Sequence, residues 1–140
     1  MRNTDPMARL RANTFRRSFH LGQLELLQLE KYGWPLIREH AEKIVRERLN
    51  KTPEHDGKQT PYKGHPVFVA QHATATCCRK CLFQWHRIPL FRDLTSEEVG
   101  MCMTLILRWI STQEDKARAQ ERPVLQTLTR ADPPVPAAVH

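Results

Sequence analysis

The segment from Val99 to Ile110 sets the strongest limit on how this chain of 140 residues can fold. Only Gly100, Thr104 and Arg108 in this segment are not apolar, and they recur every four residues on one stripe. A helix that is apolar around most of its circumference is buried at the centre of a domain. We therefore expect the other elements to pack around this helix, which could also bury part of a contact between identical subunits.

A capping box marks the start of this helix. In Thr95-Ser-Glu-Glu98 the threonine hydroxyl can accept the Glu98 N–H, while the Glu98 carboxylate reaches back to the N–H of Thr95. The sequence becomes polar after about Gln113. Residues 121–140 end in ADPPVPAAVH and are expected to form a disordered tail.

Two more helices are predicted upstream of the central one. Apolar residues between Leu21 and Tyr32 share one helical face, and Gly33 is well placed to end that helix. Trp34-Pro35 restarts the chain, since proline is favoured at the first helical position. An amphipathic rhythm then continues to about Asn50.

The region between the predicted helices is less regular. Residues 51–64 carry Pro53, Gly57, Pro61 and Gly64 without apolar periodicity, and they predict a long polar loop. The short apolar run 66–70 is read as a strand or an extended segment. A further helix is expected over residues 74–85.

Together these elements predict a mainly α protein with one compact domain of about four helices. We place the helical domain at residues 15–113. Residues 1–14 are polar and arginine-rich, and we expect a flexible basic N-terminus there. Residues 114–140 are expected to hold the end of the last helix and the disordered tail.

The stretch from His65 to Pro89 gathers candidate metal ligands. It holds three of the four cysteines and three of the seven histidines: Cys77, Cys78, Cys81, His65, His72 and His86. On one continuous helix the three thiols would fall within about 100° of one another, while His72 and His86 would point to the other side. Zinc favours tetrahedral sulfur and nitrogen ligands, and two residues between cysteines is a common half-site. This pattern predicts a zinc site in the cluster of Cys77, Cys78 and Cys81, using Cys81 with either Cys78 or Cys77. A histidine would reach it from before the helix (His65 or His72) or from after the helix ends (His86).

Two alternatives compete with the metal site. Free cysteines are often small buried core residues, as we expect for Cys102. A reactive thiol is the other alternative, because a helix N-terminus and adjacent basic side chains lower a thiol pKa. That alternative is a thiol-based or metal-dependent enzyme centred on Cys78 or Cys81, with His72 or His86 as the base. An enzyme should show a pocket lined by polar groups such as Gln59, Thr60 and Gln71, whereas a structural zinc site should be closed by four protein ligands.

The charge balance points to acidic partners. The net charge is +7, from 22 Lys+Arg and 15 Asp+Glu. Nucleic acid is the first partner to consider for such a chain, although a solvated basic surface without any partner is the alternative. The arginines that could form one nucleic-acid-binding patch are Arg16, Arg17, Arg79, Arg87 and Arg92.

The cellular location of the protein can be predicted by asking whether its apolar stretches resemble a signal peptide or a membrane-spanning helix. The N-terminal residues do not resemble a signal peptide, and the apolar run 99–110 is too short to span a bilayer. We therefore expect a soluble cytoplasmic protein that does not associate with a membrane. In a reducing compartment the clustered cysteines are expected to be ligands, reactive thiols or core residues rather than disulfides.

The central motif resembles a known family. His65-Pro-Val-Phe-Val-Ala-Gln-His-Ala-Thr-Ala-Thr-Cys-Cys-Arg79, followed by Cys81-Leu, Trp85-His86 and Ile88-Pro89, is similar to small uncharacterised bacterial proteins described only as a domain of unknown function. The resemblance extends from about Phe15 to Ile110 and includes Asp56-Gly-Lys-Gln-Thr60. It implies a single-domain cytoplasmic protein and brings no activity with it. The resemblance also leads us to expect glycine at positions 80 and 87, where this chain has Lys80 and Arg87.

Overall fold

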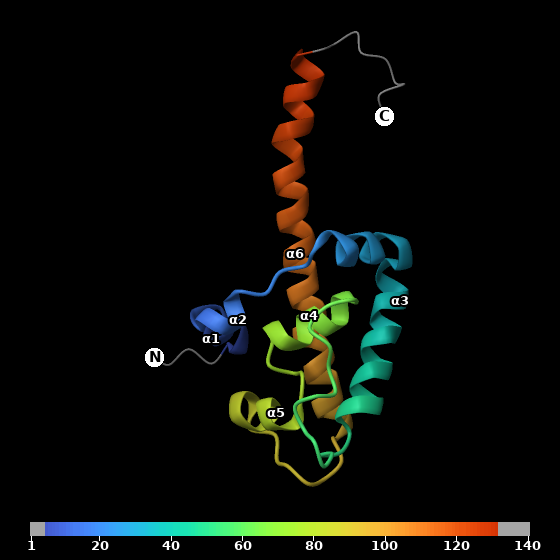
Figure 1. Cartoon of the computed structure of the whole chain (residues 1–140), viewed down its shortest axis with the longest axis vertical. Helices are drawn as coiled ribbons and strands as arrows, with labels where there is room; N and C mark the ends of the chain where they lie inside the picture. Colours follow the sequence, from blue (N-terminus) through green and yellow to red (C-terminus); the bar gives the residue numbers. More distant parts are fainter. Residues whose placement is uncertain (1–4, 132–140) are drawn as a thin grey trace.

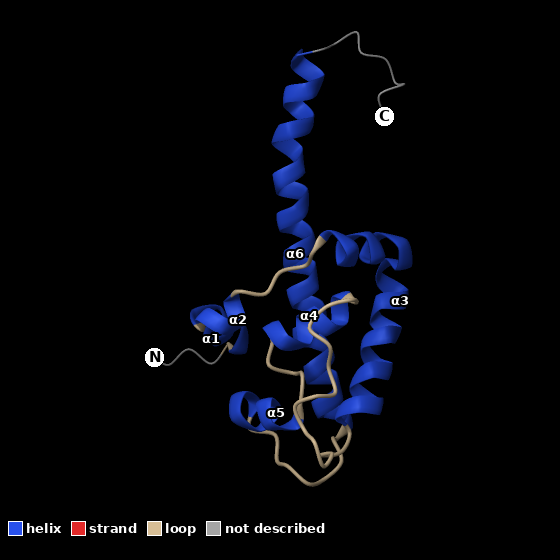
Figure 2. Ribbon diagram, viewed as in Figure 1, coloured by secondary structure: helices blue, strands red, loops and turns tan. Residues whose placement is uncertain are grey.

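A computed structural model of the chain describes residues 5–131, with side chains described for residues 5–120. Every regular element in this range is a helix (Figure 2). This confirms the predicted mainly α class, although residues 5–131 form six helices where about four were expected. They are α1 (Pro6–Ala12), α2 (Thr14–Arg17), α3 (Gln23–Leu49), α4 (Pro66–Ala73), α5 (Arg79–His86) and α6 (Ser96–Ala131).

Helix α6 is the axis of the molecule, and α3 and α4 pack against its N-terminal half (Figure 1). One side of α6 joins the main core through fully buried residues such as Cys102, Ile106 and Ile110. On another side Leu105 packs with Met7 and Leu10 of α1 in a second, smaller cluster. Each large side chain buried in this way contributes about 1.5–3 kcal/mol of hydrophobic stabilisation. Apolar side chains on different sides of the segment 99–110 therefore pack against other helices of the same chain.

The start of α6 was predicted correctly and its end was not. The Thr95 N–H donates to the Glu98 carboxylate over 2.9 Å, and the Glu98 N–H donates to the Thr95 hydroxyl over 3.1 Å. This is the expected capping box. The helix then continues to Ala131 and extends past the other helices (Figure 1), so residues 121–131 are helical where a disordered tail was predicted. The rest of that prediction, residues 132–140, lies outside the described residues.

Helix α3 contains the interruption that the sequence predicts. Gly33 has φ 78° and ψ 163°, a left-handed conformation that favours glycine, and the helix bends there (Figure 1). Pro35 then lies in the first turn of the second helical segment. Beyond this bend Ile37, Ala41 and Val45 face the core and are fully buried.

Two segments differ from their predicted structure. Residues 66–70, read as extended, belong to α4, because His65 accepts the Val67 N–H at Nδ1 over 3.0 Å and Pro66 occupies the first turn. The expected flexible N-terminus contains α1, which Asp5 caps through its carboxylate. The polar loop 51–64 contains no helix or strand, as predicted. No helix within residues 5–131 has the length and apolar character needed to cross a membrane.

Candidate metal and thiol site

A buried turn between α4 and α5 positions the first two cysteines. The Thr74 hydroxyl donates to the Ala70 carbonyl over 2.7 Å, and the Gln71 side-chain amide donates to the Thr76 carbonyl over 3.0 Å. Ala75 adopts a left-handed φ of 58°, which reverses the chain. Residues 74–78 are therefore a fixed turn. The sequence had predicted that a helix starts there, and that prediction was wrong. α5 begins at Arg79.

The long polar loop holds this turn and the start of α5 in place. Asp56 accepts the backbone N–H groups of Arg79 and Lys80 over 3.1 and 2.8 Å, so it serves as the N-terminal cap that Cys78 does not provide. Thr60 donates its hydroxyl hydrogen bond to the Cys77 carbonyl over 2.7 Å. The loop thus fixes the backbone on both sides of Cys78.

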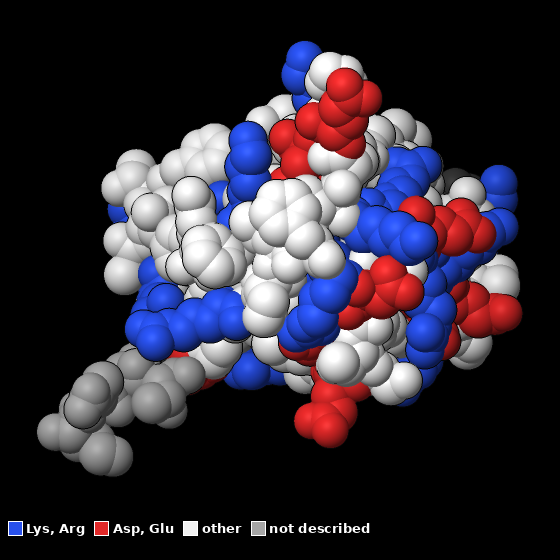
Figure 3. Space-filling view, turned by 90° about the horizontal axis from the view of Figure 1, so that it is seen from below, with Lys and Arg blue, Asp and Glu red and all other residues white. Residues whose placement is uncertain are grey.

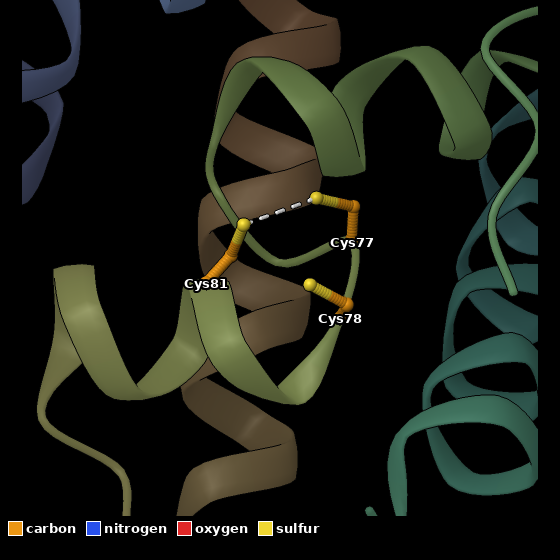
Figure 4. A group of neighbouring side chains, drawn as sticks. All are labelled: Cys77, Cys78 and Cys81. Carbon is orange, nitrogen blue, oxygen red and sulfur yellow. Dashed lines mark hydrogen bonds between the residues drawn. The ribbon is translucent and has the colours of Figure 1, made fainter. Parts of the chain in front are cut away.

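Three cysteine side chains converge above this junction, and we call them the thiol cluster: Cys77, Cys78 and Cys81 (Figure 4). Their sulfur atoms all lie within 4.8 Å of one another, and the Cys77 thiol donates to the Cys81 sulfur over 3.6 Å. Cys77 and Cys78 are buried and Cys81 is partly exposed. The cluster forms because the turn folds back over the first turn of α5. The sequence had instead predicted that the three cysteines share one face of a single helix, but only Cys81 lies within α5.

Arg16 of α2 completes the surroundings of the thiol cluster. Its Nη2 donates to the Cys81 sulfur over 3.2 Å, and its Nη1 donates to the His72 carbonyl over 2.7 Å. Nη1 also lies 3.9 Å from the Cys77 sulfur. Only 9% of Arg16 is exposed. A buried guanidinium beside three thiols favours negative charge on the sulfur atoms.

The surroundings favour the thiolate form most strongly at Cys81. Its pKa lies well below the ordinary value for a thiol, because hydrogen bonds from Cys77 and Cys78, and then the Arg16 guanidinium, stabilise the thiolate. The pKa of Cys77 is raised by its hydrogen bonds with the other two thiols and by burial. Burial, and then the charge of Glu98, raises the pKa of Cys102 to about 12. All four cysteines are free thiols.

The two candidate histidines stand beside the cluster. His72 directs Nε2 to the Thr60 carbonyl at 3.0 Å, and His86 directs Nε2 to the Thr74 carbonyl at 2.8 Å. Each ring therefore has at least one nitrogen engaged by a backbone carbonyl. Neither histidine belongs to the group of ligand atoms within 4.8 Å of one another, so the described residues bring together only the three cysteines of the predicted ligand set. Burial lowers the pKa of both rings.

The expected polar pocket residues have structural roles. Gln71 is fully buried and bonds the turn, and Thr60 bonds the backbone of Cys77. The Gln59 side-chain amide donates to Asp56 over 2.8 Å and so orients the cap of α5. These three side chains therefore hold the turn and the start of α5 in place.

The five arginines assigned to a nucleic-acid-binding patch do not form one surface. Arg16 is buried against the thiols, and Arg79 is fully buried with its guanidinium on the carbonyls of Leu49 and Asn50 at the end of α3. Figure 3 shows the end of the molecule where α5 lies, and basic and acidic side chains are mixed there. Arg92 belongs to such a mixture, because it pairs with Glu98 at 2.7 Å. Arg17 and Arg87 are exposed.

Comparison with known protein families identifies one that covers most of the chain. A model of the family described as a domain of unknown function (DUF4186) matches residues 4–111. The chain belongs to this family. The DUF4186 match includes Arg16, the loop with Asp56, and all three residues of the thiol cluster, which confirms the resemblance found in the sequence. No solved structure matches the chain.

Arg16 and Asp56 are the site residues that sequence reasoning did not assign correctly. Arg16 was placed in the nucleic-acid patch, since nothing in a linear sequence tells that a residue of α2 reaches a sulfur of α5. Asp56 stands in a motif that carried the family resemblance but received no role. A helix is usually capped by the residue just before it, whereas Asp56 lies 23 residues before Arg79. The sequence alone therefore did not indicate that Asp56 caps α5.

Proposed function

We propose that this protein binds one zinc ion through Cys77, Cys78 and Cys81. The observation that carries the proposal is the convergence of three sulfur atoms within 4.8 Å of one another. Two sulfur atoms bound to one tetrahedral zinc ion at about 2.3 Å are about 3.8 Å apart. The 3.6 Å between the sulfur atoms of Cys77 and Cys81 is close to that value.

The charge of the surroundings supports the same proposal. Three thiolates and one Zn²⁺ carry a net charge of about −1, which a neighbouring guanidinium neutralises. Arg16 supplies that positive charge and an N–H group 3.2 Å from the Cys81 sulfur. Hydrogen bonds of this kind orient and tune metal-bound thiolates. The cluster supplies three ligands, and a fourth position would be taken by water, a small molecule or the Nδ1 of a nearby histidine.

Native mass spectrometry of the untagged protein tests the proposal. After removal of metal and addition of zinc, the intact chain should gain the mass of one ion. Cys81→Ser should abolish this gain. Cys102→Ser is the matched control, because Cys102 is a fully buried core thiol away from the cluster, and it should leave the gain unchanged. Absence of zinc binding by the natural sequence at micromolar zinc would overturn the proposal.

A second candidate function is thiol chemistry at Cys81. The contact between Arg16 and Cys81 favours it, since a cation at 3.2 Å stabilises a nucleophilic thiolate. Cys81 is also the most exposed member of the cluster. In this case metal-free protein should react with iodoacetamide at Cys81 at pH 6, where an ordinary thiol with a pKa near 8.5 is almost fully protonated. Peptide mapping would identify the alkylated residue.

A further inference from the structure

A cavity of about 170 Å³ lies between the N-terminal helices and α6, and none of the three cysteines lines it. Helices α1 and α2 lie beside α6 in Figure 1. Residues of all three helices line the cavity. Met7 and Leu10 of α1 and Trp109 of α6 give it an apolar wall. The same three side chains belong to the smaller hydrophobic cluster that attaches α1 to α6.

The other walls of the cavity are strongly basic. Arg11, Arg16, Arg17 and Lys116 all line it, and none of its lining residues is acidic. Within the part of the chain whose side chains are described, Arg11 and Lys116 have no side-chain hydrogen bond or ion pair. Four positive groups around one partly enclosed space raise the local potential, because low-dielectric walls concentrate the field.

Two acidic residues close in sequence to the cavity lining make contacts with groups that do not line it. Glu114 accepts the indole N–H of Trp34 over 3.3 Å and pairs with Arg118. Asp5 lies 3.7 Å from Arg108. Because Arg16 lies against the Cys81 thiol, the positive charge available to a bound anion comes mainly from Arg11, Arg17 and Lys116.

We propose that this cavity binds a small organic anion, a carboxylate or a phosphate ester that carries an apolar group. The cations hold the anionic group, and the wall of Met7, Leu10 and Trp109 holds the apolar group. A volume of 170 Å³ corresponds to about a dozen water-sized positions, which fits a compact metabolite rather than an extended polymer. The proposal does not depend on zinc, although Arg16 lines the cavity and also contacts the thiol cluster.

Phenyl phosphate is a suitable probe because it combines a dianion with one aromatic ring. Titration of the full chain, followed by calorimetry and by ¹H–¹⁵N correlation spectra, should show saturable binding of one molecule. The amide signals of Leu10, Ala73 and Gln113, which line the cavity, should shift together. Shifts centred on another region, or no saturation, would overturn the proposal.

Charge substitutions separate this site from a general effect of net charge. Arg17→Gln with Lys116→Gln should weaken binding about tenfold, since each exposed charge contact is worth up to about a factor of five. Arg38→Gln with Lys58→Gln removes the same charge from exposed positions outside the cavity and should leave the affinity unchanged. Equal losses in the two double variants would contradict the proposal.

Two further titrations complete the test. Metal-free Cys81→Ser protein should bind phenyl phosphate as the natural sequence does, so failure of the zinc proposal would leave this result intact. A single-stranded oligonucleotide should not displace phenyl phosphate at physiological salt. Displacement by the oligonucleotide would indicate a nucleic-acid surface and overturn the assignment to a small anion.

Discussion

The Nη2 of Arg16 donates a hydrogen bond to the sulfur of Cys81 over 3.2 Å, although the two residues are 65 positions apart. This contact joins the N-terminal helices to the thiol cluster. It also places a permanent positive charge beside the most exposed of the three thiols. The charge state of the cluster therefore depends on the docking of α2.

Replacing Arg16 should weaken zinc binding and raise the pKa of Cys81. In Arg16→Gln the thiolate loses its cation, so alkylation of metal-free protein at pH 6 should become slower. Loss of a partner that orients a ligand typically reduces metal affinity by about 10–100-fold. Competition with a chromophoric chelator measures this affinity. The exposed neighbour Arg17 provides the control, and identical behaviour of Arg16→Gln and Arg17→Gln would refute the role given to Arg16.

Removing the cap on α5 should destabilise the protein. Asp56→Ala leaves the N–H groups of Arg79 and Lys80 without their acceptor, and loss of such a cap costs about 1–2 kcal/mol. Urea unfolding followed by circular dichroism gives the free energy. Glu54→Ala removes an exposed acid of the same loop and should change stability by less than about 0.5 kcal/mol. Equal effects of the two substitutions would argue against the cap.

Arg87→Gly should stabilise the protein. Arg87 follows the last turn of α5 with φ 59°, a left-handed conformation that costs a residue with a Cβ about 1 kcal/mol. Glycine adopts it without that cost, and we expect a gain of about 0.5–1 kcal/mol in the free energy of unfolding. The thermal midpoint measures this gain. The comparison variant Lys80→Gly lies within α5 and should instead lose stability.

His65 should make stability depend on pH. Burial and then the charge of His40 lower the pKa of His65 to about 4, so the folded protein holds this ring neutral while the unfolded chain binds a proton below about pH 6.5. The folded state therefore has its full stability with respect to this ring above about pH 6.5. As the pH falls from 6.5 towards 4, protonation of His65 in the unfolded chain lowers the free energy of unfolding. The slope is at most about 1.4 kcal/mol per pH unit for one proton.

A single substitution isolates this effect. His65→Asn keeps a good N-terminal cap for α4 and removes the titrating ring. Urea unfolding at several pH values between 7 and 4 should therefore show a shallower fall in stability for the variant. Parallel curves would exclude His65 as a source of the pH dependence.

Local patterns in the sequence predicted the parts of the fold that depend on near neighbours. The bend at Gly33 and the capping box at Thr95 and Glu98 are set within a few residues, and both are present. Helix α4 was missed because a short apolar run suits a strand as well as a buried helix. The signal that could have identified it is His65-Pro66, a capping residue followed by a proline in the first turn.

The thiol cluster shows where such patterns stop. The sequence predicted that Cys77, Cys78 and Cys81 would meet, but a helical wheel gave the wrong geometry because the turn before α5 depends on Thr74 and Gln71. The contributions of Arg16 and Asp56 come from segments far apart in the chain. Contacts between residues so far apart in sequence depend on how the helices pack, and the spacing of residues along the chain does not reveal them.

X-ray absorption at the zinc edge measures the proposed ligand set most directly. For the zinc-loaded natural sequence we predict three sulfur neighbours at about 2.3 Å and one lighter oxygen or nitrogen neighbour. In Cys102→Ser the spectrum should be the same, because Cys102 lies in the core away from the cluster. A zinc ion with one sulfur neighbour or none would contradict the account.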